Sequence, residues 1–251
     1  MKMKREIEIM SYLKTHGVVH IQELSRFLKV SKNTVRRDLK SLEDQGLLEM
    51  KRGGAALPNE MNLGISLSER EIQNIDEKRR IGECANRLIP DKASVILDAG
   101  TTTEQIALAI KNRKGLTVIT NALNILIHLA DEKEITSVSI GGVINPVTRC
   151  FTGFHAEQFL SQFHVAVAFV SAGGVTEQGV TNTNALEVPI KRKMLEIADK
   201  VILVVTHDKF GKKSLSQFAS LDQIDVIVTD AQADPKMVQR FESMGIEVML
   251  C

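Results

Sequence analysis

The sequence predicts an α/β protein in which a small, mainly helical domain (residues 1–57) is joined by a linker (58–75) to a larger domain (76–251). Residues 1–57 contain 12 Lys and Arg against 7 Asp and Glu, a balance of +5, and the remainder contains 20 against 24, a balance of −4. Beyond Lys92, short apolar runs rich in β-branched residues alternate with helical patterns, which indicates a mainly parallel sheet covered by helices. A hydrophobic content of 43% over 251 residues suffices for one large core and one small core.

Three helices are expected in the small domain, at Lys4–Lys14, Ile21–Leu28 and Lys32–Gln45. A short turn precedes the third helix, and the Ser31 hydroxyl is placed to cap it. In that helix, apolar residues recur at i, i+4 and i+7 and form a stripe that can face a core: Val35, Leu39 and Leu42. A helix, a turn and a capped helix in this order predict a helix-turn-helix.

The opposite face of the third helix carries an amide and three cations, which suits the major groove of DNA. Arginine reads guanine edges, asparagine reads adenine edges, and cations also bind phosphates. After Gly46, two short strands that meet at Gly53-Gly54 would form a wing with cations at its tip. We therefore expect a winged helix that binds double-stranded DNA through Ser31, Lys32, Asn33, Thr34, Arg36, Arg37, Lys40, Lys51 and Arg52. The alternative is a solvated surface helix that is basic without binding nucleic acid.

The linker is polar and turn-rich at Pro58–Gly64 and leads into a charged helix from Ser68, which ends before Pro90. The segment Glu77–Gly82 is either another basic patch or the solvated side of this helix, and the amphipathic spacing favours the second.

Beyond this helix, strands and helices are expected to alternate. The expected strands are 94–97, 117–120, 138–140, 165–170, 201–205, 226–228 and 247–250, and the expected helices are 103–110, 121–130, 185–198 and 236–244. In parallel sheets, ligands gather at the carboxyl ends of strands.

A candidate ligand site follows the first of these strands, at Asp98-Ala99-Gly100 and the threonines 101–103. Gly100 allows a sharp turn, and the amides of the following helix, with the threonine hydroxyls, can bind a phosphate. An ordinary helix cap would show the same residues. Small or polar residues also follow the next three strands, at 120–122, 141–142 and 171–174, and this repetition favours a ligand crevice.

Asn184, Glu187 and Lys191 extend the candidate site. Glu187 and Lys191 lie four residues apart, so they could form a simple surface pair. In the functional interpretation, Glu187 binds sugar hydroxyls and Lys191 or Arg192 binds the phosphate. Pro189 favours an irregular or first-turn position for Glu187.

The run from Val30-Ser31 through Arg36-Arg37-Asp38-Leu39, followed by Leu42-Glu43, Gly46 and Gly53-Gly54-Ala55, resembles the DNA-binding domain of DeoR-type bacterial transcription regulators. From about Asp76 onward the chain is similar to the sensor domain of the same family. The matching runs are 97–102, 119–121, Gly141-Gly142, Gly153, Ala168-Phe169, Gly173, 179–181, Asn184 with Glu187, Lys191-Arg192 and 209–211.

This resemblance implies a sensor domain related to ribose-5-phosphate isomerases and sugar-phosphate deaminases, used for sensing instead of turnover. It also implies a phosphorylated sugar or sugar derivative as effector and DNA binding by a homo-oligomer, either a dimer or a tetramer. The loops and the resemblance together give as effector-binding residues Asp98, Gly100, Thr101, Thr102, Thr103, Asn121, Gly142, Gly173, Asn184, Glu187, Lys191 and Lys209.

Two positions depart from the family pattern. Arg52 stands where a histidine usually precedes Gly-Gly-Ala, which adds a cation at the wing. Thr206 stands where an aspartate is customary before Lys209-Phe210-Gly211, and Asp208 could substitute only from another direction. If the customary aspartate shapes the effector pocket, ligand identity differs here.

The remaining composition excludes several classes of protein. Cys84, Cys150 and Cys251 are odd in number and far apart, so three reduced thiols are expected. The six histidines are scattered, no metal-ligand spacing is present, and neither a metal nor a cofactor is expected. No signal peptide and no run of roughly 20 apolar residues is found, so we expect a cytoplasmic protein without a membrane partner.

The leading hypothesis is a repressor of a carbohydrate operon that a phosphorylated sugar relieves. The alternative is a sugar-phosphate isomerase or deaminase, because Asp98, Glu187 and Lys191 include the carboxylates and the lysine that an enediol proton transfer needs. A DNA-reading domain counts against an enzyme. A third interpretation, an architectural DNA-binding protein, leaves the large second domain unexplained.

Overall fold

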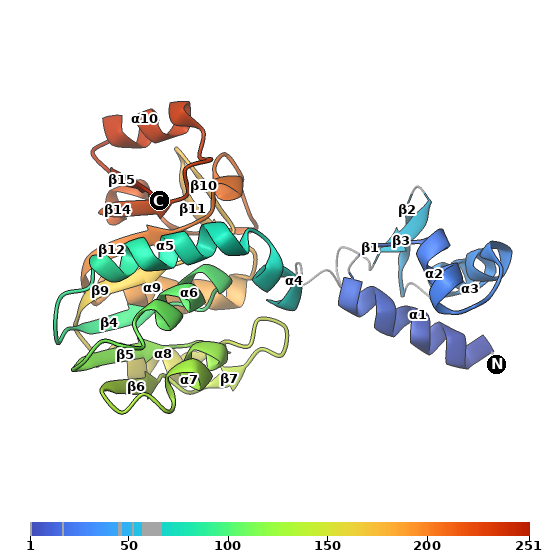
Figure 1. Cartoon of the computed structure of the whole chain (residues 1–251), viewed down its shortest axis with the longest axis horizontal. Helices are drawn as coiled ribbons and strands as arrows, with labels where there is room; N and C mark the ends of the chain where they lie inside the picture. The colour runs from blue at the N-terminus through green and yellow to red at the C-terminus, as the bar shows by residue number, and fades with distance from the viewer. Residues whose placement is uncertain (1, 17, 45–46, 52, 57–66) are drawn as a thin grey trace. The chain divides into compact units, whose positions relative to one another are not determined.

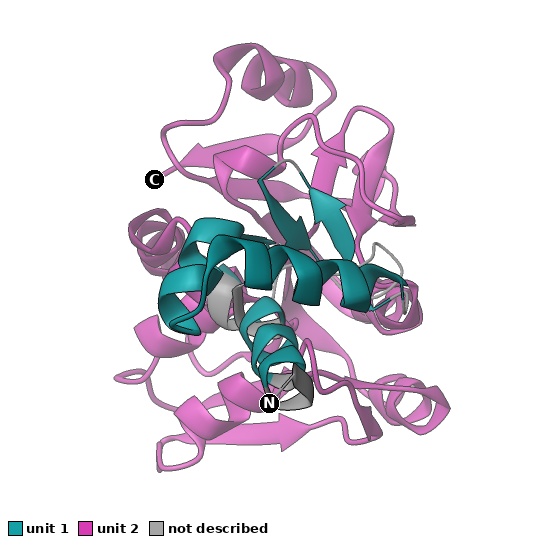
Figure 2. Cartoon of the chain, turned by 90° about the vertical axis from the view of Figure 1, so that its right-hand side faces the viewer, with its two compact units in different colours: residues 1–70 teal, residues 71–251 magenta. Residues whose placement is uncertain are grey.

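The computed structural model describes residues 2–16, 18–44, 47–51, 53–56 and 67–251. The chain divides into two compact units, Met1–Arg70 and Glu71–Cys251, which Figure 2 colours separately. The expected linker lies partly outside the described residues. Its last part is helical, in α4 (Leu67–Ile72) and the start of α5 (Ile75–Arg87).

The described residues of the first unit up to Ala56 form three helices and a small antiparallel sheet in the order β1-β3-β2 (Figure 1). The elements are α1 (Lys2–His16), β1 (Val18–His20), α2 (Ile21–Phe27), α3 (Lys32–Asp44), β2 (Glu49–Lys51) and β3 (Gly54–Ala56). The expected helices and the β2–β3 wing are therefore present. The additional strand β1 is too short to leave a pattern in the sequence.

Local chemistry explains where α3 begins and how it is held. The Ser31 Oγ accepts a hydrogen bond from the Thr34 amide at 3.1 Å, which is the expected cap. Asp38 is buried on α3, and the Arg5 guanidinium of α1 binds its two carboxylate oxygens at 2.8 and 3.1 Å. This bidentate ion pair fixes α1 against α3.

The apolar stripe of α3 is buried as expected, together with side chains from α1, α2 and β1. Gly54 begins β3 so close to β1 that a Cβ atom would lie 2.0 Å from the Val19 carbonyl oxygen. Only glycine fits at this position, which accounts for the second glycine of the wing.

The second unit contains a seven-stranded parallel sheet in the order β15-β14-β12-β9-β4-β5-β6. The strands of the sheet are β4 (Ser94–Leu97), β5 (Leu116–Thr120), β6 (Ile135–Ser139), β9 (Val165–Val170), β12 (Ala198–Val204), β14 (Val226–Thr229) and β15 (Glu247–Leu250). The helices that pack on it are α5, α6 (Thr101–Ala109), α7 (Leu123–Leu129), α8 (Phe154–Leu160), α9 (Val188–Glu196) and α10 (Pro235–Ser243). The parallel α/β prediction is thus confirmed.

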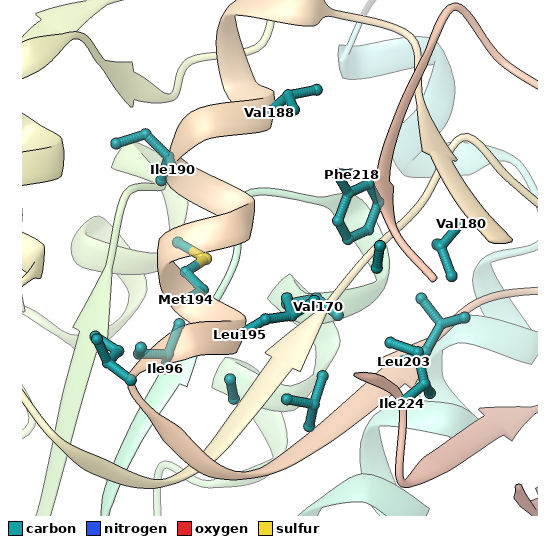
Figure 3. Close-up of a cluster of buried hydrophobic side chains, with 14 of the residues drawn as sticks. Ile96, Val170, Val180, Val188, Ile190, Met194, Leu195, Leu203, Phe218 and Ile224 are labelled. Carbon is teal, nitrogen blue, oxygen red and sulfur yellow. The ribbon is translucent and has the colours of Figure 1, made fainter. Parts of the chain in front are cut away.

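The sheet separates two apolar cores. Val95 and Leu97 of β4 face one core with α5, α6 and α7, whereas Ile96 faces the other with α8, α9 and α10. Figure 3 shows the second core, which contains Leu195 of α9 and Val170 of β9. Because both faces are covered, central strands such as β4, β9 and β14 are nearly continuous apolar runs, which is why the sequence located them. The edge strand β6 contains Thr and Ser, and it begins three residues before the range 138–140 that was expected for it.

Several smaller elements were not predicted. A hairpin is formed by β7 (Val143–Ile144) and β8 (Phe151–Thr152), and a second antiparallel sheet by β10 (Gly174–Thr176), β11 (Gly179–Asn182) and β13 (Ser216–Ala219). Three 3₁₀ turns complete the unit, η1 (Ala185–Glu187), η2 (His207–Lys209) and η3 (Leu221–Gln223).

Two expectations for the second unit were wrong. The helix expected from Ser68 is divided, because Asn74 adopts a left-handed conformation with φ of 50° between α4 and α5. Three reduced thiols were expected, but Cys84 and Cys251 form a disulfide and only Cys150 is free. The 167 residues between the paired cysteines leave no local signal for this contact. Within the described part of the chain, no helix is long and apolar enough to cross a membrane.

Candidate functional site

The exposed face of α3 presents the residues that were predicted to contact DNA. Lys32, Asn33, Arg36, Arg37 and Lys40 are all exposed, as is the capping residue, and Thr34 is half-buried. The Arg36 Nη1 donates to the Asn33 Oδ1 at 3.1 Å, so these two side chains are held in a fixed relation. The dry stripe and the cationic face thus lie on opposite sides of the helix, as a major-groove helix requires.

Not every cation of this surface is equally available. The Lys40 Nζ lies 2.7 Å from Glu43 and 3.4 Å from Asp44, and hydrogen bonds to these carboxylates raise the pKa of Lys40. Lys51 of the wing is exposed and pairs with Glu49 at 2.7 Å. Arg52 lies outside the described residues.

In the second unit, a buried ion pair joins the end of β4 to α9. Asp98 and Lys191 each have a side chain that is 1% exposed, and the Lys191 Nζ binds the Asp98 Oδ2. The same carboxylate oxygen accepts hydrogen bonds from the Ser171 amide and hydroxyl, both at 2.9 Å. Lys191 therefore neutralises Asp98, and it is neither a surface partner of Glu187 nor a free cation.

Glu187 lies beside this pair in a cluster of uncharged donors. Its carboxylate accepts from Asn182 at 2.9 Å, from Asn184 at 3.2 Å and from the Cys150 thiol at 3.2 Å. Glu187 is in the turn η1, immediately before α9 with Pro189 in its first turn, so the irregular position expected for Glu187 is confirmed.

Cys150 is influenced electrostatically by both Glu187 and Asp98, so it connects the cluster around Glu187 with the Asp98–Lys191 pair. Burial is the largest cause that raises the pKa of the Cys150 thiol to about 12, and the charges of Glu187 and Asp98 add to it. Cys150 therefore lies near both carboxylates and remains a protonated donor at neutral pH.

The amino end of α6 adjoins Asp98. Thr101, Thr102 and Thr103 are buried there, and the Thr103 hydroxyl donates to the Gly100 carbonyl at 2.9 Å. The Asn121 Oδ1 accepts from the Ala99 amide at 2.9 Å, which ties the end of β5 to the same turn. The first amides of any α-helix lack partners within the helix, so they are available to an anion here.

The glycines of the predicted site have a packing explanation. A Cβ atom would lie 2.6 Å from the Ser171 Oγ at Gly100, 2.6 Å from the Thr152 carbonyl at Gly142 and 2.5 Å from the Ser214 Oγ at Gly173. Neighbouring protein atoms therefore leave no room for a side chain at these three positions, and no ligand is needed to explain why they are glycine.

Lys209 belongs to a separate cluster after β12. Its Nζ binds the Asp208 Oδ2 at 2.8 Å, and the Thr206 hydroxyl donates to the Asp208 Oδ1 at 2.5 Å. Within the described residues, no hydrogen bond or ion pair joins Lys209 to Asp98, Glu187 or Lys191. The structure thus brings most of the predicted residues to the ends of β4, β5 and β9, and Lys209 follows β12, the strand next to β9 in the sheet.

Three residues of this region were not among those predicted as ligand-binding: Ser171, Cys150 and Asn182. Ser171 was within a loop that the sequence indicated. Cys150 and Asn182 lie in short strands or loops with no recognisable pattern, and only the tertiary contact with Glu187 reveals them.

A winged helix with a basic recognition helix, followed by an α/β domain with a polar cluster at the carboxyl ends of its strands, defines a DNA-binding regulator with its own sensor domain. Residues 5–61 match the DeoR-like helix-turn-helix domain, and residues 73–231 match the DeoR C terminal sensor domain. The chain belongs to the DeoR family of transcription regulators.

Full-length relatives agree with this assignment. The chain is 37% identical to the HTH-type transcriptional regulator IolR of Bacillus subtilis, over 95% of both chains. It is 34% identical to the HTH-type transcriptional repressor GlcR of the same organism, over 98% of this chain and 95% of the other. It is 30% identical to the glycerol-3-phosphate regulon repressor of Escherichia coli, over 99% of this chain and 98% of the other. These relatives are regulators and not enzymes, so the isomerase alternative is set aside.

Among solved structures, ribose 5-phosphate isomerase A from Methanocaldococcus jannaschii is similar over 55% of both chains, with 18% identity and a TM-score of 0.41.

Proposed function

We propose that the protein represses an operon for carbohydrate use and that a phosphorylated sugar or sugar derivative relieves this repression. One observation carries the proposal. Buried charged and polar side chains from β4, β9, η1 and α9 meet beside the amino end of α6, where amides and threonine hydroxyls are available to a phosphate. Relatives named as a repressor and as a glycerol-3-phosphate regulon repressor support the sign of regulation and the chemistry of the effector.

Each part of the site has a role in this proposal. The amides and hydroxyls of Thr101 and Thr102 bind the phosphate, and Glu187 accepts hydrogen bonds from sugar hydroxyls. Lys191 keeps Asp98 neutralised and in place, because its ammonium group is already bound to that carboxylate. The phosphate thus depends on donors of α6 more than on Lys191.

On DNA, α3 enters the major groove and the wing contacts the backbone. One recognition helix gives limited affinity, so a homo-oligomer that binds repeated half-sites is part of the proposal. The effector relieves repression only by binding more tightly to the state that cannot bind the operator.

The test is a thermal-shift screen of the full chain with pairs of phosphorylated and unphosphorylated compounds, such as fructose 1-phosphate and fructose or glycerol 3-phosphate and glycerol. A compound that raises the melting temperature only when it carries its phosphate is expected, since ligands of the native state stabilise it. Thr102→Val is expected to bind this compound about 10- to 150-fold more weakly, because the loss of a hydrogen bond to a charged group costs roughly 1.5–3 kcal/mol.

The control is Thr136→Val, which changes an exposed threonine on β6 in the same way. If phosphorylated and unphosphorylated compounds act alike, or if both variants bind equally, the phosphate site at α6 is wrong.

A further inference from the structure

Asn74 occupies the junction between α4 and α5, the point at which the chain enters the sensor domain. Its φ of 50° makes it one of the few non-glycine residues in the left-handed region. The Asn74 carbonyl accepts a hydrogen bond from the Lys78 amide at 2.9 Å, within the first turn of α5. The Asn74 Nδ2 donates to the Asp208 Oδ1 at 3.1 Å, across 134 residues of sequence. The direction of the chain at this junction is therefore tied to η2.

Asp208 divides its two oxygens between different partners. Oδ1 accepts from Asn74 and from the buried Thr206 hydroxyl, whereas Oδ2 binds the Lys209 ammonium at 2.8 Å and lies 3.6 Å from the Lys212 Nζ. Burial opposes ionisation, but the hydrogen bonds from Lys209 and Thr206 and the charges of both lysines lower the pKa of Asp208 to about 2. One carboxylate that is charged at neutral pH thus connects a cationic pair to the junction residue.

We propose that Asp208 couples effector binding to the α4–α5 junction, with an anionic group of the effector as the competitor for Lys209 and Lys212. This inference rests on the proposed sensing function. An anion that binds these lysines removes the cations that hold Oδ2 in place, and Asp208 then no longer holds Asn74. The anion binds more tightly to the state in which Lys209 has left Asp208 than to the state in which the two are paired. A ligand shifts an equilibrium between two states only through such a difference in its affinity for them.

The consequence reaches the DNA-binding domain through the polypeptide itself, because α4 contains the boundary between the two units in sequence. A change at Asn74 alters the direction in which the chain enters α5. Coupling of this kind is typically worth roughly 5- to 150-fold in affinity.

The decisive variant is Asn74→Gly, because glycine tolerates the positive φ and removes only the side-chain donor. Gln73→Gly is the matched control: it adds the same backbone freedom one residue earlier, where the side chain is exposed. Two quantities are measured on the full chain, with an operator selected from random duplexes. The first is binding of fructose 1-phosphate, fructose 6-phosphate, glucose 6-phosphate and glycerol 3-phosphate by thermal shift. The second is the ratio of operator Kd with and without the compound that binds.

Asn74→Gly is expected to bind the compound as the wild type does, within about twofold, while its Kd ratio falls to within twofold of one. Gln73→Gly keeps the wild-type ratio, and Asp208→Asn loses it. The inference is overturned if Asn74→Gly keeps the wild-type ratio, or if Gln73→Gly loses as much. If none of the four compounds binds the wild type, the proposed sensing function itself fails with these effectors, and the role of Asp208 falls with it.

Discussion

The buried pair of Asp98 and Lys191 predicts a large loss of stability when only the lysine is removed. Lys191→Met leaves the Asp98 carboxylate buried without a cation, and breaking such a pair from one side costs about 3–5 kcal/mol. In a domain of this size, 1 kcal/mol shifts the melting temperature by roughly 2–4 °C, so a fall of roughly 6–20 °C is expected.

The assay is calorimetry of the full chain, followed at the transition of larger enthalpy, since enthalpy grows with the number of residues that unfold. Lys193→Met is the control on the same helix. Its ion pair with Glu196 has an exposed partner, so a change of less than about 1 kcal/mol is expected. Asp98→Asn in the Lys191→Met background removes the uncompensated charge and is expected to restore part of the lost stability.

A melting temperature of Lys191→Met that matches Lys193→Met would refute the reasoning. It would mean that the Asp98 carboxylate does not depend on Lys191, and that the pair does not organise the ends of β4 and β9. A double variant that is less stable than Lys191→Met would equally count against a charge-based explanation.

The remaining predictions concern single groups. Arg36→Ala is expected to weaken operator binding by about 1–3 kcal/mol and to relax base preference at one position, measured by gel shift at fixed salt; Lys40→Ala, whose cation is already paired, is expected to cost less, and the reverse order would contradict the assignment. Because the pKa of Cys150 is raised to about 12, its thiol is expected to resist iodoacetamide in the native protein at pH 8, and rapid alkylation found by peptide mass spectrometry would show that it is not buried beside Glu187. Because the pKa of Asp208 is lowered to about 2, the stability that its charge adds is complete above about pH 4 and is lost as the pH falls toward 2. The free energy of unfolding of wild type is expected to exceed that of Asp208→Asn by about 1 kcal/mol or less. The resulting difference in melting temperature should be equal at pH 7 and pH 5 and smaller at pH 3.

The parts of the fold that the sequence predicts are those with a strong local pattern. The strands β4, β9 and β15 have the bounds expected for them, because apolar runs covered on both faces have few alternatives. The helix α3 follows from its periodic stripe and its serine cap. The antiparallel strands β10 and β11 are runs of three or four residues that contain Gly, Thr or Asn, and β13 is a run of four that begins with Ser and Gln; such runs are equally typical of loops.

The candidate site shows a second limit. Residue types and strand ends locate Asp98, Asn184 and Glu187, but they do not give partners. Spacing suggested that Lys191 pairs with Glu187 or binds phosphate, whereas the structure pairs it with Asp98, 93 residues away. Cys150 and Glu187 also meet through tertiary contact alone. Long-range pairing is set by how the elements pack, and no local pattern records it.

The central claim is that a phosphorylated sugar in the second unit controls DNA binding by the first. The most direct test is the operator affinity of the full chain, measured by gel shift at fixed salt, with a phosphorylated sugar and with its unphosphorylated parent. The account predicts that the phosphorylated compound raises the operator Kd by roughly 5- to 150-fold and that the parent leaves it unchanged. An operator Kd that no compound of the thermal-shift screen alters, including those that bind, would contradict it.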